Sequence, residues 1–132
     1  MSYFVDTSAL LAVIDVDDRN HKRAKRLWSK LISSGEILIC TNYILVETFA
    51  LVQHRFGMKA VRVLEDDIVP VFTVEWVDES IHKAAVSGLL AATRKKLSLV
   101  DCTSFEVMRC LGVREAFVFD PHFKEQGFIC VP

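Results

Sequence analysis

Short apolar runs alternate along the chain with longer segments in which apolar residues recur at helical spacing. Runs rich in aromatic and β-branched residues predict strands at 3–5, 37–40, 69–74, 116–119 and 127–131. Helical spacing, interrupted by polar breaks, predicts helices at 7–14, 20–33, 42–56, 59–67, 78–96 and 98–111. Because strands alternate with helices or helix pairs, we expect an α/β fold whose mostly parallel sheet of 4-5 strands has helices on both faces.

The first predicted strand passes into a helix at a carboxylate. Residues 3–5 are the apolar run, and helical spacing begins directly after Asp6. Thr7 or Ser8 is expected to cap this helix, because a side-chain oxygen there can accept hydrogen bonds from its first N–H groups. Asp6 then lies at the carboxyl end of a central strand, where open α/β sheets hold their ligands.

Three further acids occupy similar junctions. Glu47 lies early in the helix after the second strand, inside a run that is apolar around much of its circumference. Asp101 falls in the first turn of the helix that Ser98 begins, and Asp120 ends the fourth strong strand. In a parallel sheet the carboxyl ends of strands and the N-termini of the following helices share one edge. We therefore expect all four acids to face the same rim.

Gathered carboxylates repel one another and raise one another's pKa unless a cation lies between them. The four histidines, His21, His54, His82 and His122, lack metal-ligand spacing, so we expect oxygen donors alone. Oxygen donors favour Mg²⁺ or Mn²⁺ over zinc. One or two such ions can activate water and offset the charge on a phosphate, which suits phosphodiester hydrolysis without a nucleophilic side chain.

Each acid also has a purely structural interpretation. Asp101 can close a capping box with Ser98, Asp120 can open a turn before Pro121, and Asp6 can cap its helix. Glu47 is the hardest to explain in this way, because burying an uncompensated carboxylate is costly. The placement of all four at one end of the sheet favours a functional site.

Length and composition limit the alternatives. The 132 residues are 52% hydrophobic and 25% charged, with a net charge of -1, which predicts a single globular domain over 1-132. The charge neither indicates nor excludes nucleic-acid binding, because a small basic face can coexist with an acidic site. The sequence has no apolar run long enough for a membrane helix, no signal-peptide pattern and no C-x-x-C pair. We expect a cytoplasmic protein with reduced thiols.

Four segments that contain the acids follow an order typical of one nuclease family. They are 4–10, 46–48, 97–105 and 119–123, and together they extend over essentially the whole chain. Each motif is weak alone, whereas the ordered set is fairly specific. In these segments the chain resembles the PIN-domain ribonucleases, particularly the VapC-type toxins of prokaryotic toxin–antitoxin pairs.

The resemblance implies a three-layer α/β/α PIN-like domain with Mg²⁺- or Mn²⁺-dependent endoribonuclease activity. Asp6, Glu47, Asp101 and Asp120 would be the metal-binding and catalytic acids. Hydroxyl groups would support them, with Thr7 or Ser8 at the first acid and Ser98 or Ser104 at the third. Such toxins are commonly homodimers and are neutralised by a small antitoxin encoded beside them.

The chain departs from the family pattern at one position. Many members carry Ser or Thr two residues before the fourth acid, where this chain has Val118. A polar contact near the metal is then missing or comes from another group.

The sequence also suggests contact surfaces. Two basic groups could hold RNA phosphates, namely Arg19, Lys22, Arg23, Lys25 and Arg26 and, farther along, Arg94, Lys95 and Lys96. A solvated helix face is the structural alternative for both groups. The helices at 7–14, 42–56 and 59–67 carry the most apolar surface and are the expected antitoxin face.

Two other functions remain open. One is a catalytically silent PIN-like module that keeps the fold and the acids and binds RNA or a protein partner. The other is a phosphatase with Asp6 as covalent nucleophile. Such phosphatases usually place a second Asp two residues later, where this chain has Ser8.

Overall fold

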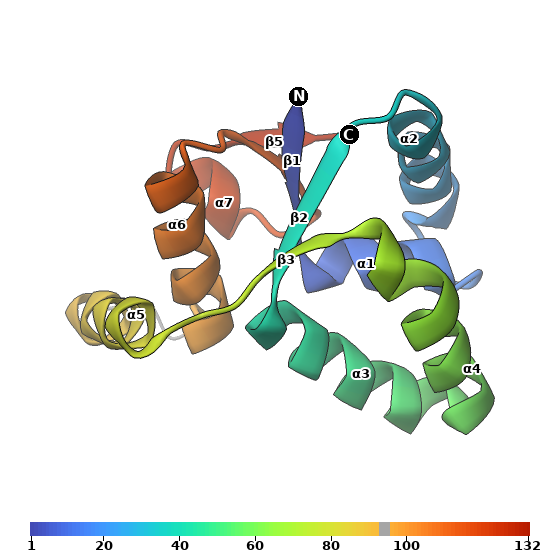
Figure 1. The fold of residues 1–132 in the computed structure, drawn as a ribbon, viewed down its shortest axis with the longest axis horizontal. Coiled ribbons are helices and arrows are strands. Elements are labelled where there is room, and N and C mark those ends of the chain that lie inside the picture. Colours follow the sequence, from blue (N-terminus) through green and yellow to red (C-terminus); the bar gives the residue numbers. More distant parts are fainter. Residues whose placement is uncertain (93–95) are drawn as a thin grey trace.

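A five-stranded, all-parallel sheet forms the centre of the molecule, as a computed structural model that describes residues 1–92 and 96–132 shows (Figure 1). The strand order is β3-β2-β1-β4-β5. The strands are β1 (Ser2–Val5), β2 (Ile37–Thr41), β3 (Thr73–Glu75), β4 (Glu115–Phe117) and β5 (Ile129–Val131). The predicted parallel sheet is confirmed.

Helices cover both faces of this sheet. The helices are α1 (Thr7–Ile14), α2 (His21–Ser33), α3 (Asn42–Phe56), α4 (Met58–Val63), α5 (Glu79–Ala91), α6 (Leu99–Leu111) and α7 (His122–Glu125). Figure 1 shows α1 to α4 on one side of the strands and α5 to α7 on the other. This arrangement is the three-layer α/β/α fold that was expected.

The connections reverse direction at β1. From β1 the chain moves outward through β2 to β3, and it then returns past β1 to β4 and β5. β1 therefore lies between β2 and β4, with Phe4 opposite Ile39 on one side and Ala116 on the other. Parallel sheets bind ligands outside the carboxyl ends of their strands at such a switch point, because the two neighbouring connections there leave on opposite faces.

The core is built around β1. Phe4 and Val5 are completely buried, as are Leu38 and Phe117 on the two flanking strands. Phe123 anchors α7 to this core, with its ring 5.0 Å from the ring of Phe105 in α6. A smaller cluster lies under α1, α3 and α4, and its buried members are Leu11, Val52 and Leu64. Burial of apolar side chains on both faces supplies most of the stability of such a sheet.

Several predicted boundaries were wrong. Only Thr73–Glu75 of the predicted strand 69–74 is a strand, because Pro70 lies in a 3-10 turn at Val69–Val71 and cannot donate a ladder hydrogen bond. β3 is nevertheless at an edge, as its proline suggested. The predicted strand 116–119 ends at Phe117, since the N–H of Phe119 bonds to the Ser8 hydroxyl instead.

Two other local expectations also change. The short helix α7 was not predicted, and the side chain that caps α1 is that of Asp6 rather than Thr7 or Ser8.

All four cysteines are free, and Cys40 and Cys102 are the buried ones. Among the described residues no helix is both long and apolar enough to cross a membrane.

Candidate metal centre

Asp6 begins the site at the carboxyl end of β1. Its backbone is extended, and its carboxylate oxygen Oδ2 accepts hydrogen bonds from the Ser8 N–H (3.0 Å) and the Ser8 hydroxyl (2.7 Å). The same hydroxyl accepts a hydrogen bond from the N–H of Phe119 (3.1 Å), just after β4. Ser8 therefore ties the first acid to the chain segment that carries the fourth one.

Asp101 is held at the start of α6 by a capping box. Its N–H donates to the Ser98 hydroxyl (3.0 Å), and its Oδ2 accepts from the Ser98 N–H (3.1 Å). The structural interpretation of Asp101 is therefore correct. It does not exclude a ligand role, because the box needs only one of the two carboxylate oxygens.

Asp120 adopts a turn that brings a histidine beside it. Its Oδ1 accepts a hydrogen bond from the N–H of His122 (2.8 Å), across Pro121. One carboxylate oxygen from Asp101, one from Asp120 and one ring nitrogen from His122 all lie within 4.8 Å of one another. These three donors form a compact group from two elements that are far apart in the sequence.

Burial and the charge of neighbouring carboxylates make Asp6 and Asp101 hard to ionise. Burial raises the pKa of Asp6 to about 6 from an ordinary 3.8, the hydrogen bonds from Ser8 oppose the rise, and the charges of Asp101 and Asp120 add to it. Burial also raises the pKa of Asp101, and the Asp120 charge adds to that rise. A divalent cation would relieve both costs, so the donor set fits a metal ion.

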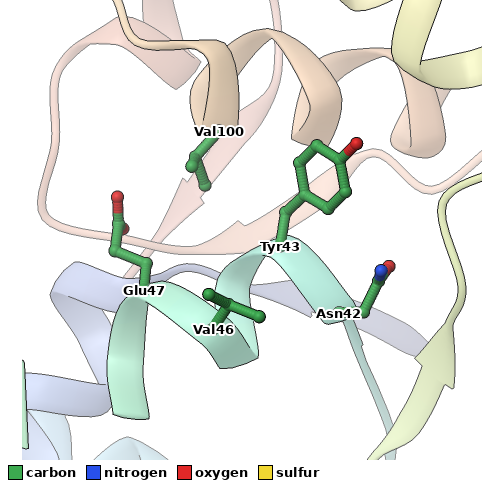
Figure 2. A pocket seen from close by; sticks show the side chains of 5 residues that line it. All are labelled: Asn42, Tyr43, Val46, Glu47 and Val100. Carbon is green, nitrogen blue, oxygen red and sulfur yellow. The ribbon is translucent and has the colours of Figure 1, made fainter. Parts of the chain in front are cut away.

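Glu47 stands beside this group rather than within it. It is half-buried on α3 and lines a pocket of about 340 Å³ together with Asn42, Tyr43, Val46 and Val100. Figure 2 shows the Glu47 side chain extending from α3 in the direction of the first turn of α6, where Val100 lies next to Asp101 in sequence. The compact group thus contains Asp101, Asp120 and His122, Asp6 lies near enough for the charges of Asp101 and Asp120 to raise its pKa, and Glu47 lines the adjoining pocket.

The predicted supporting hydroxyls divide into two pairs. Ser8 and Ser98 contact the acids directly. Thr7 instead accepts a long hydrogen bond from Thr48 (3.4 Å), and Ser104 donates to the carbonyl oxygen of Val100 (3.0 Å). Thr7 and Ser104 therefore stabilise the helices behind the site and make no hydrogen bond to its acids in the described part of the chain.

From the sequence His122 was set aside, yet one of its ring nitrogens belongs to the compact group of donors. The four histidines have no regular ligand spacing, which is why they were set aside. The useful signal was Asp120-Pro121-His122, since an Asp before Pro commonly bonds the N–H two residues later. That turn directs the imidazole back beside the Asp120 carboxylate.

Comparison with known proteins shows the family to which this chain belongs. The model of the PIN domain matches residues 3–129, nearly the whole chain. The chain belongs to the PIN-domain family. It is 35% identical over 127 residues to a curated protein named 23S rRNA-specific endonuclease VapC20, from Mycobacterium tuberculosis. That match covers 96% of this chain and 95% of the relative.

Solved structures agree with this assignment. The crystal structure of M. tuberculosis VapC20, described as a Sarcin-Ricin loop cleaving toxin, superimposes with a TM-score of 0.86 and 34% identity over 96% of each chain. FitAcB from Neisseria gonorrhoeae has a TM-score of 0.71 at 16% identity, covering 100% of this chain and 97% of that one. VapBC2 from Rickettsia felis, bound to a promoter DNA fragment, has a TM-score of 0.72 at 9% identity, covering 98% and 97%. The last two likenesses show the fold alone, whereas the family and nuclease class predicted from the sequence are confirmed.

One of the predicted basic residues reaches the segment before Asp120. Arg19, Lys22, Arg23, Lys25 and Arg26 are all exposed, in or just before α2. The guanidinium of Arg23 lies 5.8 Å from the ring centroid of Phe119, the residue before Asp120. In the second group Lys96 is exposed two residues before Ser98, whereas Arg94 and Lys95 lie outside the described residues.

The high pKa of Asp6 predicts how pH affects stability without metal. Between the ordinary pKa of 3.8 and the raised value of about 6, the folded protein holds a proton that the unfolded chain releases. The Asp6 contribution is therefore most favourable below the lower value and is lost as pH rises through the upper one. Asp6→Asn keeps the helix cap and should raise the free energy of unfolding by about 3 kcal/mol near neutral pH, since one pKa unit corresponds to about 1.4 kcal/mol.

Urea unfolding in a chelator, measured at several pH values, checks this prediction. The gap between Asp6→Asn and the parent protein should widen from acidic to neutral pH. Asp17→Asn, at an exposed position, should follow the parent protein throughout. Parallel curves for Asp6→Asn and the parent would show that Asp6 is not held in an unfavourable charged state.

Proposed function

We propose that this chain is a metal-dependent endoribonuclease of toxin type, which hydrolyses an RNA phosphodiester bond at the carboxyl edge of its sheet. The observation that carries the proposal is the close grouping of Asp101, Asp120 and His122 beside the buried Asp6, whose pKa is raised by the charges of Asp101 and Asp120. Closely gathered carboxylates with raised pKa values are stable as anions only beside a cation. A phosphate substrate would have the same requirement, because its negative charge also needs a cation.

The acids have separate roles in this proposal. Asp6, Asp101 and Asp120 would hold Mg²⁺ or Mn²⁺, which when bound supplies positive charge to the phosphate and activates water for attack. Ser8 and Ser98 fix the first and third acids before substrate arrives, which lowers the cost of ordering the site. Glu47, across the neighbouring pocket, would accept a hydrogen bond from the attacking water and orient it.

The hydroxyl expected two residues before Asp120 is absent, but the loop is still organised by a hydroxyl. Val118 is buried in the core, with only 4% of its surface exposed. Ser8 instead holds the backbone of Phe119 while it donates to Asp6. This contact supports the view that the substitution at Val118 leaves the site assembled.

RNA would approach along α2. Arg23 and Arg26 line a shallow pocket of about 250 Å³ with Leu27, Lys30 and Pro132, and Arg23 also reaches the segment before Asp120. Cationic side chains at this position can hold the phosphates that flank the scissile bond. Lys30 adds a cation that was not predicted from the sequence. Lys96, just before α6, would supply a further positive charge to the RNA.

We further propose that the substrate is 23S ribosomal RNA at its sarcin–ricin loop. The support is the 35% identity to a relative named for 23S rRNA, extending over 96% of this chain, and the likeness to a VapC20 structure described as a Sarcin-Ricin loop cleaving toxin. A ribosomal substrate would place its action in the cytoplasm.

The proposed partners would use two different apolar surfaces. Val46 and Trp76, which are 69% and 74% exposed, line one groove with Leu45, Phe49, Val69 and Val74. An apolar patch of this kind suits a second copy of the chain. Phe56, Met58 and Val63 are exposed around the α3–α4 junction, above the small cluster that also contacts α1. We assign that surface to an amphipathic segment of an antitoxin.

Cleavage assays test the proposed reaction. The protein with Mg²⁺ or Mn²⁺ should cut an RNA hairpin carrying the sarcin–ricin loop, and should leave a scrambled hairpin of the same length intact. Asp101→Asn and Asp120→Asn should each lower the rate by at least about 100-fold, because they remove charge from the centre of the site. Glu47→Gln should cost less than either variant, because Glu47 lies outside the compact group.

Glu79→Gln provides the matched control, since Glu79 is an exposed acid on α5. It should cleave like the parent protein. Binding of the hairpin without cleavage would instead support the silent module. Unchanged cleavage by Asp101→Asn would remove the proposed site altogether.

Two substitutions that introduce a negative charge test the two proposed partner surfaces one at a time. Trp76→Glu should convert a dimer to a monomer in light-scattering chromatography and leave antitoxin binding intact. Met58→Glu should weaken binding of the antitoxin encoded beside the toxin gene by at least about tenfold, equivalent to about 1.4 kcal/mol, and leave the dimer intact. A Trp76→Glu protein that remains dimeric would show that the groove is not the interface.

A further inference from the structure

His122 is the one site residue that the four-acid scheme does not use. Its side chain is only 13% exposed, and its backbone N–H is held by Asp120. The next residue, Phe123, is fully buried against the aromatic core. The imidazole is therefore fixed at the rim by a turn on one side and by core packing on the other.

The two ring nitrogens face different carboxylates. Nε2 lies 3.8 Å from Asp120 Oδ1, and Nδ1 lies 3.6 Å from Glu125 Oε2. Histidines that bind a metal through one nitrogen characteristically direct the other towards a carboxylate, which fixes the ring and raises the basicity of the ligand. Glu125 lies on that second side here, although Nδ1 makes no hydrogen bond in the described part of the chain.

These distances leave the ring nitrogens available to a ligand. Both exceed the 2.7–3.2 Å range of an N–H···O hydrogen bond, so neither nitrogen is closely bonded to its facing carboxylate. The separation of 3.8 Å between Nε2 and Oδ1 is nevertheless within the roughly 4.2 Å that two ligands at about 2.1 Å from one ion can span. One carboxylate oxygen of Asp101 lies within 4.8 Å of a ring nitrogen, a limit slightly larger than this span.

We propose that His122 is a nitrogen ligand of the divalent ion, oriented by Glu125, and that it gives the site a preference for Mn²⁺ over Mg²⁺. This inference rests on the proposed metal-dependent function. Mg²⁺ is a hard ion that takes oxygen ligands and keeps several waters, whereas imidazole suits the later divalent ions better. An all-carboxylate site would lack this basis for preferring Mn²⁺.

Pulsed electron paramagnetic resonance on the Mn²⁺-loaded protein tests the ligand directly. The parent protein should show the coupling of a directly coordinated imidazole nitrogen, and His122→Gln should lose it. His54→Gln, at an exposed position near the end of α3, should retain it. Mn²⁺ bound without nitrogen coupling in the parent protein would overturn the inference, whatever the folding of the variant.

Calorimetry provides a second readout that does not depend on activity. His122→Gln should weaken Mn²⁺ binding by at least about tenfold and Mg²⁺ binding much less, and Glu125→Gln should weaken Mn²⁺ binding by about tenfold through the ring. If His122 were instead a positive charge paired with Asp120, its removal would strengthen binding of both ions. That result would overturn the proposal.

The same samples separate this proposal from the proposed function. RNA cleavage by a parent protein whose Mn²⁺ shows no nitrogen coupling would leave the nuclease intact and remove only the role of His122. Failure of the parent protein to bind either ion would contradict both.

Discussion

Repulsion between carboxylates at a partly dry sheet edge is the constraint on which the rest of this structure depends. Asp6 and Asp101 are almost fully buried, and each lies in the field of Asp120. Without a counterion, such an arrangement lowers stability near neutral pH. The acids that lower stability lie at the switch point between β1 and β4, where a parallel sheet leaves room for a ligand. We regard the cost as the structural reason for metal dependence.

Each of the three converging acids has one carboxylate oxygen bonded to a backbone N–H nearby in sequence. Asp6 accepts from Ser8, Asp101 accepts from Ser98, and Asp120 accepts from His122. These bonds are a helix cap, a capping box and a turn, which are the structural roles that the sequence suggested as alternatives to function. The two interpretations are compatible, because a carboxylate can cap with one oxygen and bind with the other. Capping also fixes each acid before any ligand arrives.

The sequence predicted the elements and the sheet well because both depend on local spacing and burial. It also predicted the edge at which Asp6, Asp101 and Asp120 meet, since parallel topology places strand ends and helix starts together. It could not predict which side of α3 carries Glu47 relative to α6, because the packing of two helices decides that. The place of His122 beside the acids could not be predicted for a related reason, since it depends on a turn and on the burial of Phe123. The strand predicted at 69–74 is shorter in the structure because Pro70 cannot donate a ladder hydrogen bond, which its apolar neighbours do not reveal.

The central claim is that Asp6, Asp101 and Asp120 share one divalent ion. A crystal structure of the protein soaked in Mn²⁺, with anomalous scattering recorded at the manganese edge, measures this most directly. We expect an anomalous peak at the carboxyl edge of the sheet, within bonding distance of these aspartates. Full Mn²⁺ occupancy at some other place, with these carboxylates unligated, would contradict it.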